Sequence, residues 1–435
     1  MPSSAPDSRS PAPGSPNRFE LFASTAPDLE SIAAGELKTH GVKGRQEVGG
    51  VAFGGDLDRI YQANLWLRTA SRVVVRLGRF HASTFYELER RSKKIPWADF
   101  LPATGPVALR VTCRKSRLYH SDAVAERVLS AIARAAPRAI EMKTETAVAD
   151  EDGDETADSS APEQGQPQLF IVRIVDDECE ISADSSGALL HKRGYRQETG
   201  KAPLRETLAA AMVLASGWKR GDPLLDPMCG SGTIPIEAAL IARGAAPGLL
   251  RDFQFMKWPG FDGKLWKEML EQAREGMTDD VRGEVRGTDR DAGAIAAAVR
   301  NAQRAGVSEA IKFSVDALSA SVSKLDDVGA GPGWILTNPP YGVRVGESAE
   351  LRNLYASLGT VLKSKQGWRL GMLTADPMLA RQTGLPLRPR FSTSNGGIPV
   401  QFLATEKRGK ADAPSLEPRF GRRPGESNGQ RRQVR

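Results

Sequence analysis

Two short strings constrain the fold of this 435-residue chain more than any other feature. The first is Asp226-Pro-Met-Cys-Gly-Ser-Gly-Thr233, and the second, about a hundred residues later, is Thr337-Asn-Pro-Pro-Tyr-Gly342. Each follows a short apolar run that predicts a buried strand. Two loops of this kind, in this order, indicate one doubly wound α/β domain with its ligands at the carboxyl ends of the strands.

The first string is a glycine loop between a predicted strand (residues 222–226) and a predicted helix (residues 234–242). Gly230 and Gly232 allow a sharp turn and let a ligand approach the backbone, while the new helix offers free N–H groups. The spacing is that of neither a dinucleotide fingerprint nor a P-loop. The acidic strand end would repel a pyrophosphate but suits the cationic methionine moiety of S-adenosylmethionine (SAM).

Two more carboxylates follow predicted strands. Residues 285–289 end in Asp289, which we expect to bind the vicinal hydroxyls of a ribose. Asp291 stands at the following helix start, where a capping role is open to it. Residues 311–316 end in Asp316, which can accept an adenine N–H, although a solvated strand-end carboxylate fits its position equally well.

The second string places hydrogen-bond acceptors after an apolar strand. Pro339 and Pro340 fix φ and remove N–H donors, so the carbonyl oxygens there have no local partner. If the Asn338 side-chain oxygen and the Pro339 carbonyl each accept one N–H of an aromatic amine, the lone pair of that amine is directed at the methyl donor. Tyr341 then offers a face on which the base stacks. The alternative is a rigid Pro-Pro turn without chemistry.

Together the strings resemble those of the class I amino-methyltransferases, which carry a glycine loop after the first strand and Asn/Asp-Pro-Pro-Tyr/Phe after the fourth. Four further segments are similar to the THUMP-domain guanine-N2 methyltransferases that modify ribosomal or transfer RNA: residues 191–196, 205–211, 251–258 and 394–398. The resemblance covers roughly residues 17–406.

The resemblance implies SAM as cofactor and a single Rossmann-like catalytic domain after an α+β RNA-binding region. It implies that the following residues bind the cofactor: Asp226, Pro227, Cys229, Gly230, Gly232, Thr233, Asp289, Asp316 and Asn338. It also implies that Asn338, Pro339, Pro340 and Tyr341 hold the target guanine.

The N-terminal half predicts a small α+β region. Its periodic segments predict these elements: strands at 19–23 and 107–113, helices at 29–37 and 124–135, a helix end and strand within 65–79, and a hairpin over 169–183. By resemblance the chain divides into the following parts: a ferredoxin-like part (17–70), a THUMP domain (71–186) and a SAM-dependent methyltransferase domain (187–406).

The net charge of +7 is unevenly distributed. Residues 17–148 hold 21 basic and 14 acidic side chains, and residues 407–435 hold nine basic and three acidic ones, while residues 168–406 are nearly neutral. This pattern predicts an RNA-docking module and a basic tail that contact phosphates. Within the module, phosphate contacts are expected from Arg114, Lys115 and Arg117, for which a solvated charged face is the alternative.

Composition also excludes several classes of protein. Three segments are expected to be disordered: residues 1–16, an acidic insert at 149–167, and the tail at 407–435. No run of 18 apolar residues predicts a membrane span, and the N-terminus lacks the apolar core of a signal peptide.

Three scattered cysteines and four histidines predict no metal site and a cytoplasmic location. No histidine or basic residue adjoins Cys229, so we do not expect it to be a nucleophile.

We therefore expect a SAM-dependent RNA methyltransferase that forms N2-methylguanosine, with 23S rRNA favoured over tRNA. The chemistry of the strings alone predicts amine methylation and leaves adenine N6, in RNA or DNA, and a protein glutamine amide open. A DNA adenine methyltransferase is disfavoured because no target-recognition domain follows the second string. A non-catalytic RNA-binding assembly factor would predict a damaged string, and both strings are intact.

Overall fold

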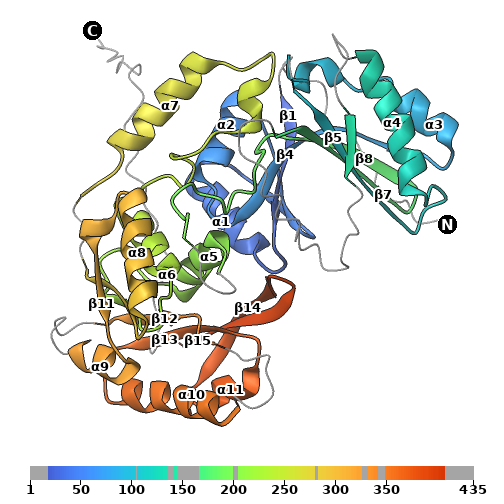
Figure 1. Cartoon of the computed structure of the whole chain (residues 1–435). Helices are drawn as coiled ribbons and strands as arrows, with labels where there is room; N and C mark the ends of the chain where they lie inside the picture. Colours follow the sequence, from blue (N-terminus) through green and yellow to red (C-terminus); the bar gives the residue numbers. More distant parts are fainter. Residues whose placement is uncertain are drawn as a thin grey trace, which may run out of the picture.

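The structure is a computed structural model that describes residues 18–103, 105–135, 142–145, 166–198, 204–279, 283–325, 332–340 and 348–406, with the backbone alone over 142–145 and at 348. The described residues form two sheets, one from the N-terminal and one from the C-terminal half of the chain (Figure 1).

The C-terminal sheet has seven strands in the order β11-β10-β9-β12-β13-β15-β14. Their bounds are β9 (Leu224–Asp226), β10 (Val285–Asp289), β11 (Ile311–Val315), β12 (Trp334–Thr337), β13 (Arg369–Thr374), β14 (Leu387–Asn395) and β15 (Ile398–Thr405). Neighbours from β11 to β13 are parallel, and β15 is antiparallel to both β13 and β14. The carboxyl ends of β9 to β13 therefore meet at one edge of the sheet, which we call the carboxyl edge.

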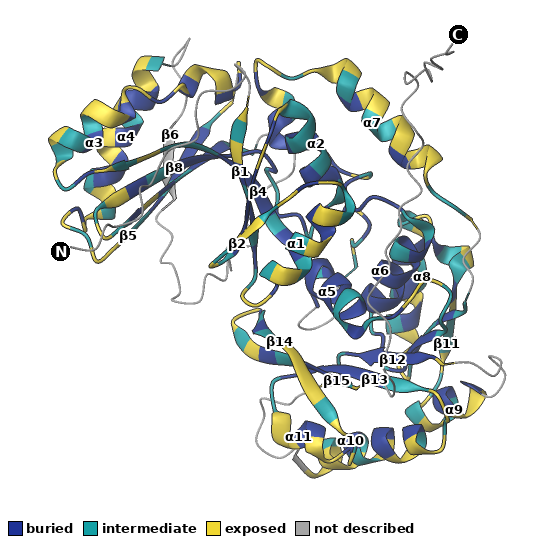
Figure 2. Ribbon diagram, turned by 180° about the vertical axis from the view of Figure 1, so that it is seen from behind, coloured by how far each residue is buried: buried dark blue, intermediate teal, exposed yellow. Residues whose placement is uncertain are grey.

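Helices cover both faces of this sheet. One face carries α5 (Glu206–Ser216), α6 (Thr233–Arg243) and α8 (Ala292–Arg304), and the other carries α9 (Leu318–Ser323), α10 (Ser348–Lys363) and α11 (Pro377–Arg381). Nearly every residue of α5 and α6 is buried (Figure 2), which explains why these segments are apolar all round rather than amphipathic. The arrangement confirms the predicted Rossmann-like, doubly wound α/β domain.

The N-terminal sheet has eight strands in the order β2-β3-β1-β4-β8-β7-β5-β6. Their bounds are β1 (Phe19–Thr25), β2 (Arg45–Glu47), β3 (Gly50–Gly55), β4 (Ala70–His81), β5 (Val107–Arg114), β6 (Met142–Glu145), β7 (Gln168–Val175) and β8 (Glu178–Asp184). The twelve-residue β4 pairs with β1 on one side and with β8 on the other. The ferredoxin-like and THUMP parts that the sequence predicts thus share one continuous sheet.

Four α-helices accompany this sheet: α1 (Glu30–Thr39), α2 (Leu57–Trp66), α3 (Phe85–Ser92) and α4 (Ser121–Ala135). The described chain also has three short 3₁₀ helices, of which the first lies in the N-terminal half: η1 (Trp97–Phe100), η2 (Gln254–Lys257) and η3 (Ser308–Ala310). The strands, helices and β7–β8 hairpin predicted for the N-terminal half are confirmed, as is its α+β class.

An excursion of the C-terminal half crosses to the N-terminal sheet. It contains η2 and α7 (Gly263–Glu275), and α7 lies beside α2 (Figure 1). Tyr61 of α2 stacks on Phe255 with ring centroids 4.5 Å apart, and Trp266 of α7 packs against Tyr61 edge-on at 5.9 Å. Aromatic pairs of this kind hold the two halves together through a shared apolar core.

Several predictions fall outside the described residues. They concern the N-terminal segment 1–16, nearly all of the acidic insert 149–167, and the tail 407–435. Across the described ranges, no helix combines the length and the apolar character needed to cross a lipid bilayer.

Candidate active site

The glycine loop after β9 lies at the carboxyl edge and leads directly into α6. Gly230 (φ +52°) and Gly232 (φ +85°) both adopt the left-handed conformation that glycine tolerates best. A Cβ at Gly232 would lie 2.9 Å from the Cβ of Ala298 on α8, so close packing also requires glycine there. A Cβ at Gly230 would meet no atom within 4 Å. The backbone at Gly230 is therefore open to a ligand.

Three other predicted residues of this loop are buried: Pro227, Cys229 and Thr233. The Cys229 N–H donates to the Thr288 carbonyl of β10 at 2.9 Å and so fixes the loop to the neighbouring strand. Burial raises the pKa of the Cys229 thiol well above its usual range. A thiol that stays protonated is a poor nucleophile, as the sequence predicts.

Asp289, at the end of β10, binds the backbone of the glycine loop through its carboxylate. Its Oδ2 accepts the Gly230 N–H at 3.0 Å and its Oδ1 accepts the Asp291 N–H at 3.0 Å. A carboxylate has about four acceptor positions, so roughly two remain for vicinal hydroxyls. Asp291 caps α8 by accepting the N–H groups of Gly293 and Ala294.

Asp226, at the end of β9, is a buried carboxyl group without a cation beside it. Its side chain is 2% exposed, and its Oδ1 accepts the Met228 N–H at 3.2 Å. Burial and the nearby Asp289 raise the pKa of Asp226 to about 7, although the Thr337 hydroxyl and the Met228 N–H oppose that shift. No ion pair to Asp226 exists within the described part of the chain. A cationic ligand beside it would favour the ionised form.

Asp316 follows β11 and is already engaged by the protein. Its carboxylate accepts the Ser314 hydroxyl at 2.6 Å and the Lys324 ammonium at 2.7 and 2.8 Å. Lys324 and Ser314 hold the pKa of Asp316 below its ordinary value. Three of about four acceptor positions are occupied, so one remains for an adenine N–H.

The second string continues β12 at the same edge. Thr337 is fully buried, Asn338 is half-buried, Pro339 is buried and Pro340 is exposed. The Asn338 Oδ1 is inaccessible to solvent and accepts no hydrogen bond from any described residue. Leaving a buried acceptor unpaired costs about 1–3 kcal/mol, which a ligand N–H would recover. Tyr341 lies outside the described residues.

Tyr355 of α10 contacts this string and was not predicted from the sequence. The buried Tyr355 hydroxyl lies 3.4 Å from the Pro340 carbonyl oxygen, to which it donates, and 3.4 Å from the Thr374 hydroxyl at the end of β13. A carbonyl held in this way limits how far the string can move. No local pattern marks Tyr355, because it lies on one face of an ordinary amphipathic helix.

Asn301 of α8 is a second residue that the sequence did not reveal. Its buried Nδ2 donates to the Ser231 carbonyl of the glycine loop at 3.1 Å and to the Glu198 carbonyl at 3.2 Å. Glu198 also accepts hydrogen bonds from Arg300 and Arg304. Asn301 thus ties the glycine loop to the segment that connects the two halves of the chain.

Segments quoted for the family resemblance build the junction between the halves. Arg193 and Tyr195 place their Nε and hydroxyl 3.5 and 3.0 Å from Oε1 of Glu237, a fully buried residue of α6. Arg193 also donates to the Arg68 carbonyl of the N-terminal half. Arg251 donates to four carbonyl oxygens within residues 186–192. These segments fix the relative position of the two sheets.

His191 belongs to this junction. Burial, together with the nearby cations Arg205, Arg196 and Arg193, lowers the pKa of His191 to about 3. It therefore stays neutral at physiological pH.

The predicted RNA contacts lie in the N-terminal half, at the end of β5 and in the connection from β5 to α4. The Arg117 side chain is 77% exposed, and its Nε lies 3.7 Å from Asp177, so part of its charge is compensated. Lys115 has a positive φ of 46°, and Arg114 and Lys115 are both exposed. Tyr119 in the same connection is 68% exposed and packs against His120 with ring centroids 4.0 Å apart.

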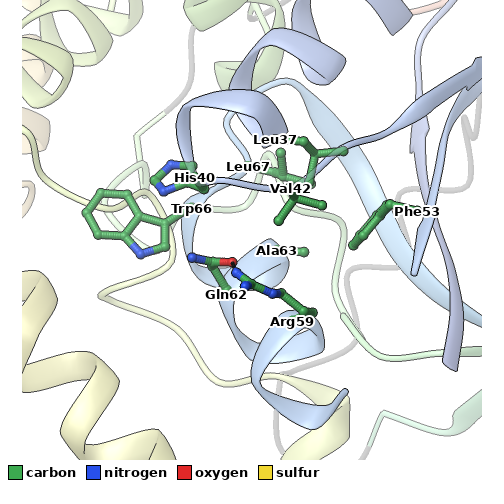
Figure 3. A pocket seen from close by; sticks show the side chains of 9 residues that line it. All are labelled: Leu37, His40, Val42, Phe53, Arg59, Gln62, Ala63, Trp66 and Leu67. Carbon is green, nitrogen blue, oxygen red and sulfur yellow. Dashed lines mark hydrogen bonds between the residues drawn. The ribbon is translucent and has the colours of Figure 1, made fainter. Parts of the chain in front are cut away.

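A small cavity in the ferredoxin-like part offers no alternative site. It is lined by apolar side chains such as Leu37, Phe53 and Leu67, with Arg59 and Gln62 at its polar side (Figure 3). Its volume of about 10 Å³ is at the lower limit for one water molecule. Within the described ranges, no three His, Cys, Asp or Glu side chains gather as metal ligands would.

Comparison with known protein families gives two matches. The RMKL-like methyltransferase domain matches residues 193–398, and the RlmL ferredoxin-like domain matches residues 20–74.

Relatives of known name match most of the chain. A Synechocystis protein named as a candidate RNA methyltransferase (slr0064) is 34% identical over 389 residues, which are 88% of this chain and 96% of that protein. The ribosomal RNA large subunit methyltransferase K/L of Syntrophotalea carbinolica is 35% identical over 410 residues, which are 91% of this chain. The chain spans 55% of the length of that relative.

Solved structures share the fold. SMU.472, a candidate methyltransferase crystallised with S-adenosylhomocysteine, matches with a TM-score of 0.75 and 29% identity, over 91% of this chain and all of that one. A Listeria monocytogenes protein described as a predicted N6-adenine-specific DNA methylase matches with a TM-score of 0.75 and 33% identity, over 90% of this chain and 97% of that one.

Proposed function

The chain belongs to the family of RMKL-like methyltransferases with an RlmL-type ferredoxin-like domain, and from that membership we propose that it methylates the exocyclic N2 of a guanine in RNA, using SAM. One observation carries the proposal: the buried, unpaired Asn338 Oδ1 stands at the same sheet edge as the open glycine loop. Methyl transfer requires that the methyl donor and the amine that receives the methyl group are held next to each other. Two ligand-binding loops at one edge of the sheet would meet that requirement.

The residues at the carboxyl edge suit the parts of SAM. Asp226 would ionise beside the cationic methionine moiety, the Gly230 backbone would lie against the nucleoside, and the remaining acceptor positions of Asp289 would take the ribose hydroxyls. Asp316 would take the adenine N–H at its last free position. When bound, SAM supplies an electrophilic methyl group on a positively charged sulfur.

The second string would prepare the target amine. Asn338 Oδ1 and the Pro339 carbonyl each accept one N–H of the guanine amine, which turns its nitrogen toward tetrahedral geometry and frees its lone pair. Pro340 keeps the backbone rigid, and Tyr341 offers a stacking face for the base. Transfer would break the bond between the methyl group and sulfur, so that S-adenosylhomocysteine leaves as a neutral thioether. The newly methylated nitrogen would carry a positive charge and would be strongly acidic, so it would lose one proton to solvent without a strong general base.

We further propose that RNA reaches this site through the N-terminal half. In that assignment residues 71–186 act as the THUMP domain, and Arg114, Lys115 and Arg117 contact phosphates. The name of the K/L relative supports 23S rRNA as the substrate in preference to tRNA, and a cytoplasmic location goes with that substrate.

Adenine N6 is the second candidate target. The description of the Listeria relative favours it, and guanine N2 and adenine N6 present the same kind of exocyclic amine to Asn338.

The test is mass spectrometry of nucleosides from separately purified 23S rRNA and tRNA, in cells with the gene, without it, and complemented with Asn338→Ala. We expect N2-methylguanosine to fall in the 23S pool without the gene and to stay low with the variant. If N2-methylguanosine falls only in the tRNA pool, the substrate is tRNA and not 23S rRNA. If N6-methyladenosine falls instead, the target base is adenine and not guanine. No change in either pool would refute RNA methylation.

A further inference from the structure

The β14–β15 hairpin extends past the carboxyl edge. Ser392 of β14 and Thr374, the last residue of β13, both pair with Gln401 of β15. Residues 393–400 therefore extend beyond the end of β13, by three residue pairs or about 10 Å. Gly396 (φ +60°) and Gly397 (φ +79°) form the turn at the tip. We call residues 393–400 the hairpin tip.

A loop of the N-terminal half joins the hairpin where it leaves the sheet. Asp28, in the β1–α1 loop, has a φ of +63°, and its Oδ2 accepts the Ser392 N–H at 3.0 Å. Leu29 of the same loop is buried in the core cluster that contains Phe391 and Val400. In both overall views the lower end of the N-terminal sheet faces β14 (Figures 1 and 2). The tip and the loop thus form one wall, made from both halves of the chain.

This wall stands at the same edge of the sheet as the target string. β15 and β14 are the second and third strands from β12, so they lie about 10 and 14 Å along the sheet from the strand that leads into the target string. Gly396, Gly397 and Pro399 at the tip are exposed and uncharged. An uncharged tip suits a base or a sugar better than a phosphate.

The outer edge of β14, behind the hairpin tip, argues against a protein strand as the partner. Arg388 and Arg390 are exposed along it. Pro389 lies between them, and the pairing register shifts between Pro389 and Phe391. Arg388 pairs with Ala404, level with Gly371 of β13, so this stretch lies behind the carboxyl edge, and the Arg388 Nε is 3.3 Å from Glu406. A proline and a bulge prevent another strand from pairing with this edge.

We propose that this wall, made by the hairpin tip and the β1–α1 loop, contacts the RNA strand that flanks the target nucleotide. The N-terminal half then helps to shape the catalytic cleft itself and does not serve only as a distant docking module. The proposal rests on the proposed function, because it requires RNA as the substrate.

Site-specific photo-crosslinking tests the wall directly. Full-length protein carries p-benzoylphenylalanine in place of Pro399 at the tip or, as a control, in place of Glu309, which is exposed near the start of β11 at the opposite edge of the sheet. Each variant is irradiated with 23S rRNA from cells that lack the gene. We expect crosslinks from position 399 that map within a few nucleotides of the methylated base, and none from 309.

The Asp28 tie is tested by kinetics. Asp28→Gly removes the acceptor without backbone strain, and Asp28→Asn keeps an acceptor. We expect Asp28→Gly to raise KM for RNA about threefold to tenfold, with kcat and SAM affinity unchanged, and Asp28→Asn to stay near wild type.

Two results would overturn the proposal while RNA methylation stands: a methylating Pro399 variant without local crosslinks, or an unchanged KM for Asp28→Gly. If the wild-type protein transfers no methyl group to RNA, the proposed function fails first and this proposal fails with it.

Discussion

At the junction between the two sheets, the buried Glu237 lies beside Arg193 and the Tyr195 hydroxyl, whereas at the carboxyl edge the equally buried Asp226 meets a backbone N–H and no described cation. Burying a carboxylate is costly in both places. The junction offsets that cost with its own residues. At the carboxyl edge no described cation offsets it, and we propose that the bound ligand does.

A raised pKa alone does not separate these regions. Burial raises the pKa of Glu206, a junction residue, to about 7, although the Arg196 guanidinium lies 3.0 Å away. Burial raises the pKa of Asp226 to the same value. What differs is the partner: Glu206 has a fixed cation and Asp226 has none among the described residues. A search for ligand sites should therefore ask which buried charge lacks a partner.

Removing the acid of the junction should have the largest effect. Glu237→Ala leaves Arg193 buried without its carboxylate, so we expect the free energy of unfolding to fall by about 3–5 kcal/mol. Urea denaturation measures it. The control is Glu271→Ala on α7, whose exposed pair with Lys267 is worth at most about 1 kcal/mol. Equal losses in the two variants would refute the contrast between junction and surface.

The next effect should appear in turnover and not in stability. Asn338→Ala removes the unpaired acceptor, so we expect kcat to fall about 10²- to 10³-fold, with RNA binding and SAM affinity nearly unchanged.

Asn64 supplies the matched control for that substitution. It lies at the junction, where its amide nitrogen donates to the Ile60 carbonyl and Ser185 hydroxyl and its oxygen accepts the Ser186 hydroxyl. Asn64→Ala should lower stability by about 1–3 kcal/mol and leave kcat of the folded enzyme unchanged. Loss of RNA binding in Asn338→Ala with normal turnover would remove the role proposed for Asn338.

Asp226 should make SAM binding depend on pH. Its pKa of about 7 in the free protein lies above the ordinary value, so its contribution to folding stability decreases as pH rises toward 7. A bound cation requires the ionised form, so affinity should increase with pH below 7, by at most about tenfold per unit, and level off above it. Titration calorimetry from pH 6 to 8 measures this.

Asp226→Asn should weaken SAM binding about tenfold or more at pH 8 and remove the contribution of this carboxyl to the pH dependence. Unchanged affinity in this variant would withdraw Asp226 from the cofactor site.

Much of the fold and of the candidate site could be predicted from local sequence. Strand, glycine turn and helix have short-range signatures, so the fold class and the family were both predicted, and the comparisons confirm them. Parallel strands bring their carboxyl ends together, which explains why Asp226, Gly230, Asp289 and Asn338 could be chosen before their positions were known. The structure places them at one edge, and their roles toward SAM and guanine stay predictions.

What could not be predicted depends on contacts between distant segments. β4 pairs with both β1 and β8. The sequence of a strand does not show which other strands it pairs with, so this continuous sheet could not be predicted. Asn301 sits in an alanine-rich helix, where nothing indicates that its amide reaches the glycine loop 70 residues earlier. The Arg193 and Arg251 segments carry the resemblance to the family, yet the hydrogen bonds of these two side chains lie at the junction.

The smallest predicted effect compares two buried tyrosines. Tyr355→Phe removes a hydroxyl whose contacts to the Pro340 carbonyl and the Thr374 hydroxyl are both long, 3.4 Å, so we expect kcat to fall only about threefold, with SAM affinity unchanged. Tyr195→Phe removes a 3.0 Å bond to Glu237 and should lower the unfolding free energy by about 1–3 kcal/mol without changing kcat. Measuring kcat and the free energy of unfolding for both variants tests whether each tyrosine acts on turnover or on stability. If Tyr355→Phe keeps full turnover, α10 does not hold the target string, and the preparation of the amine rests on Asn338 and the two prolines alone.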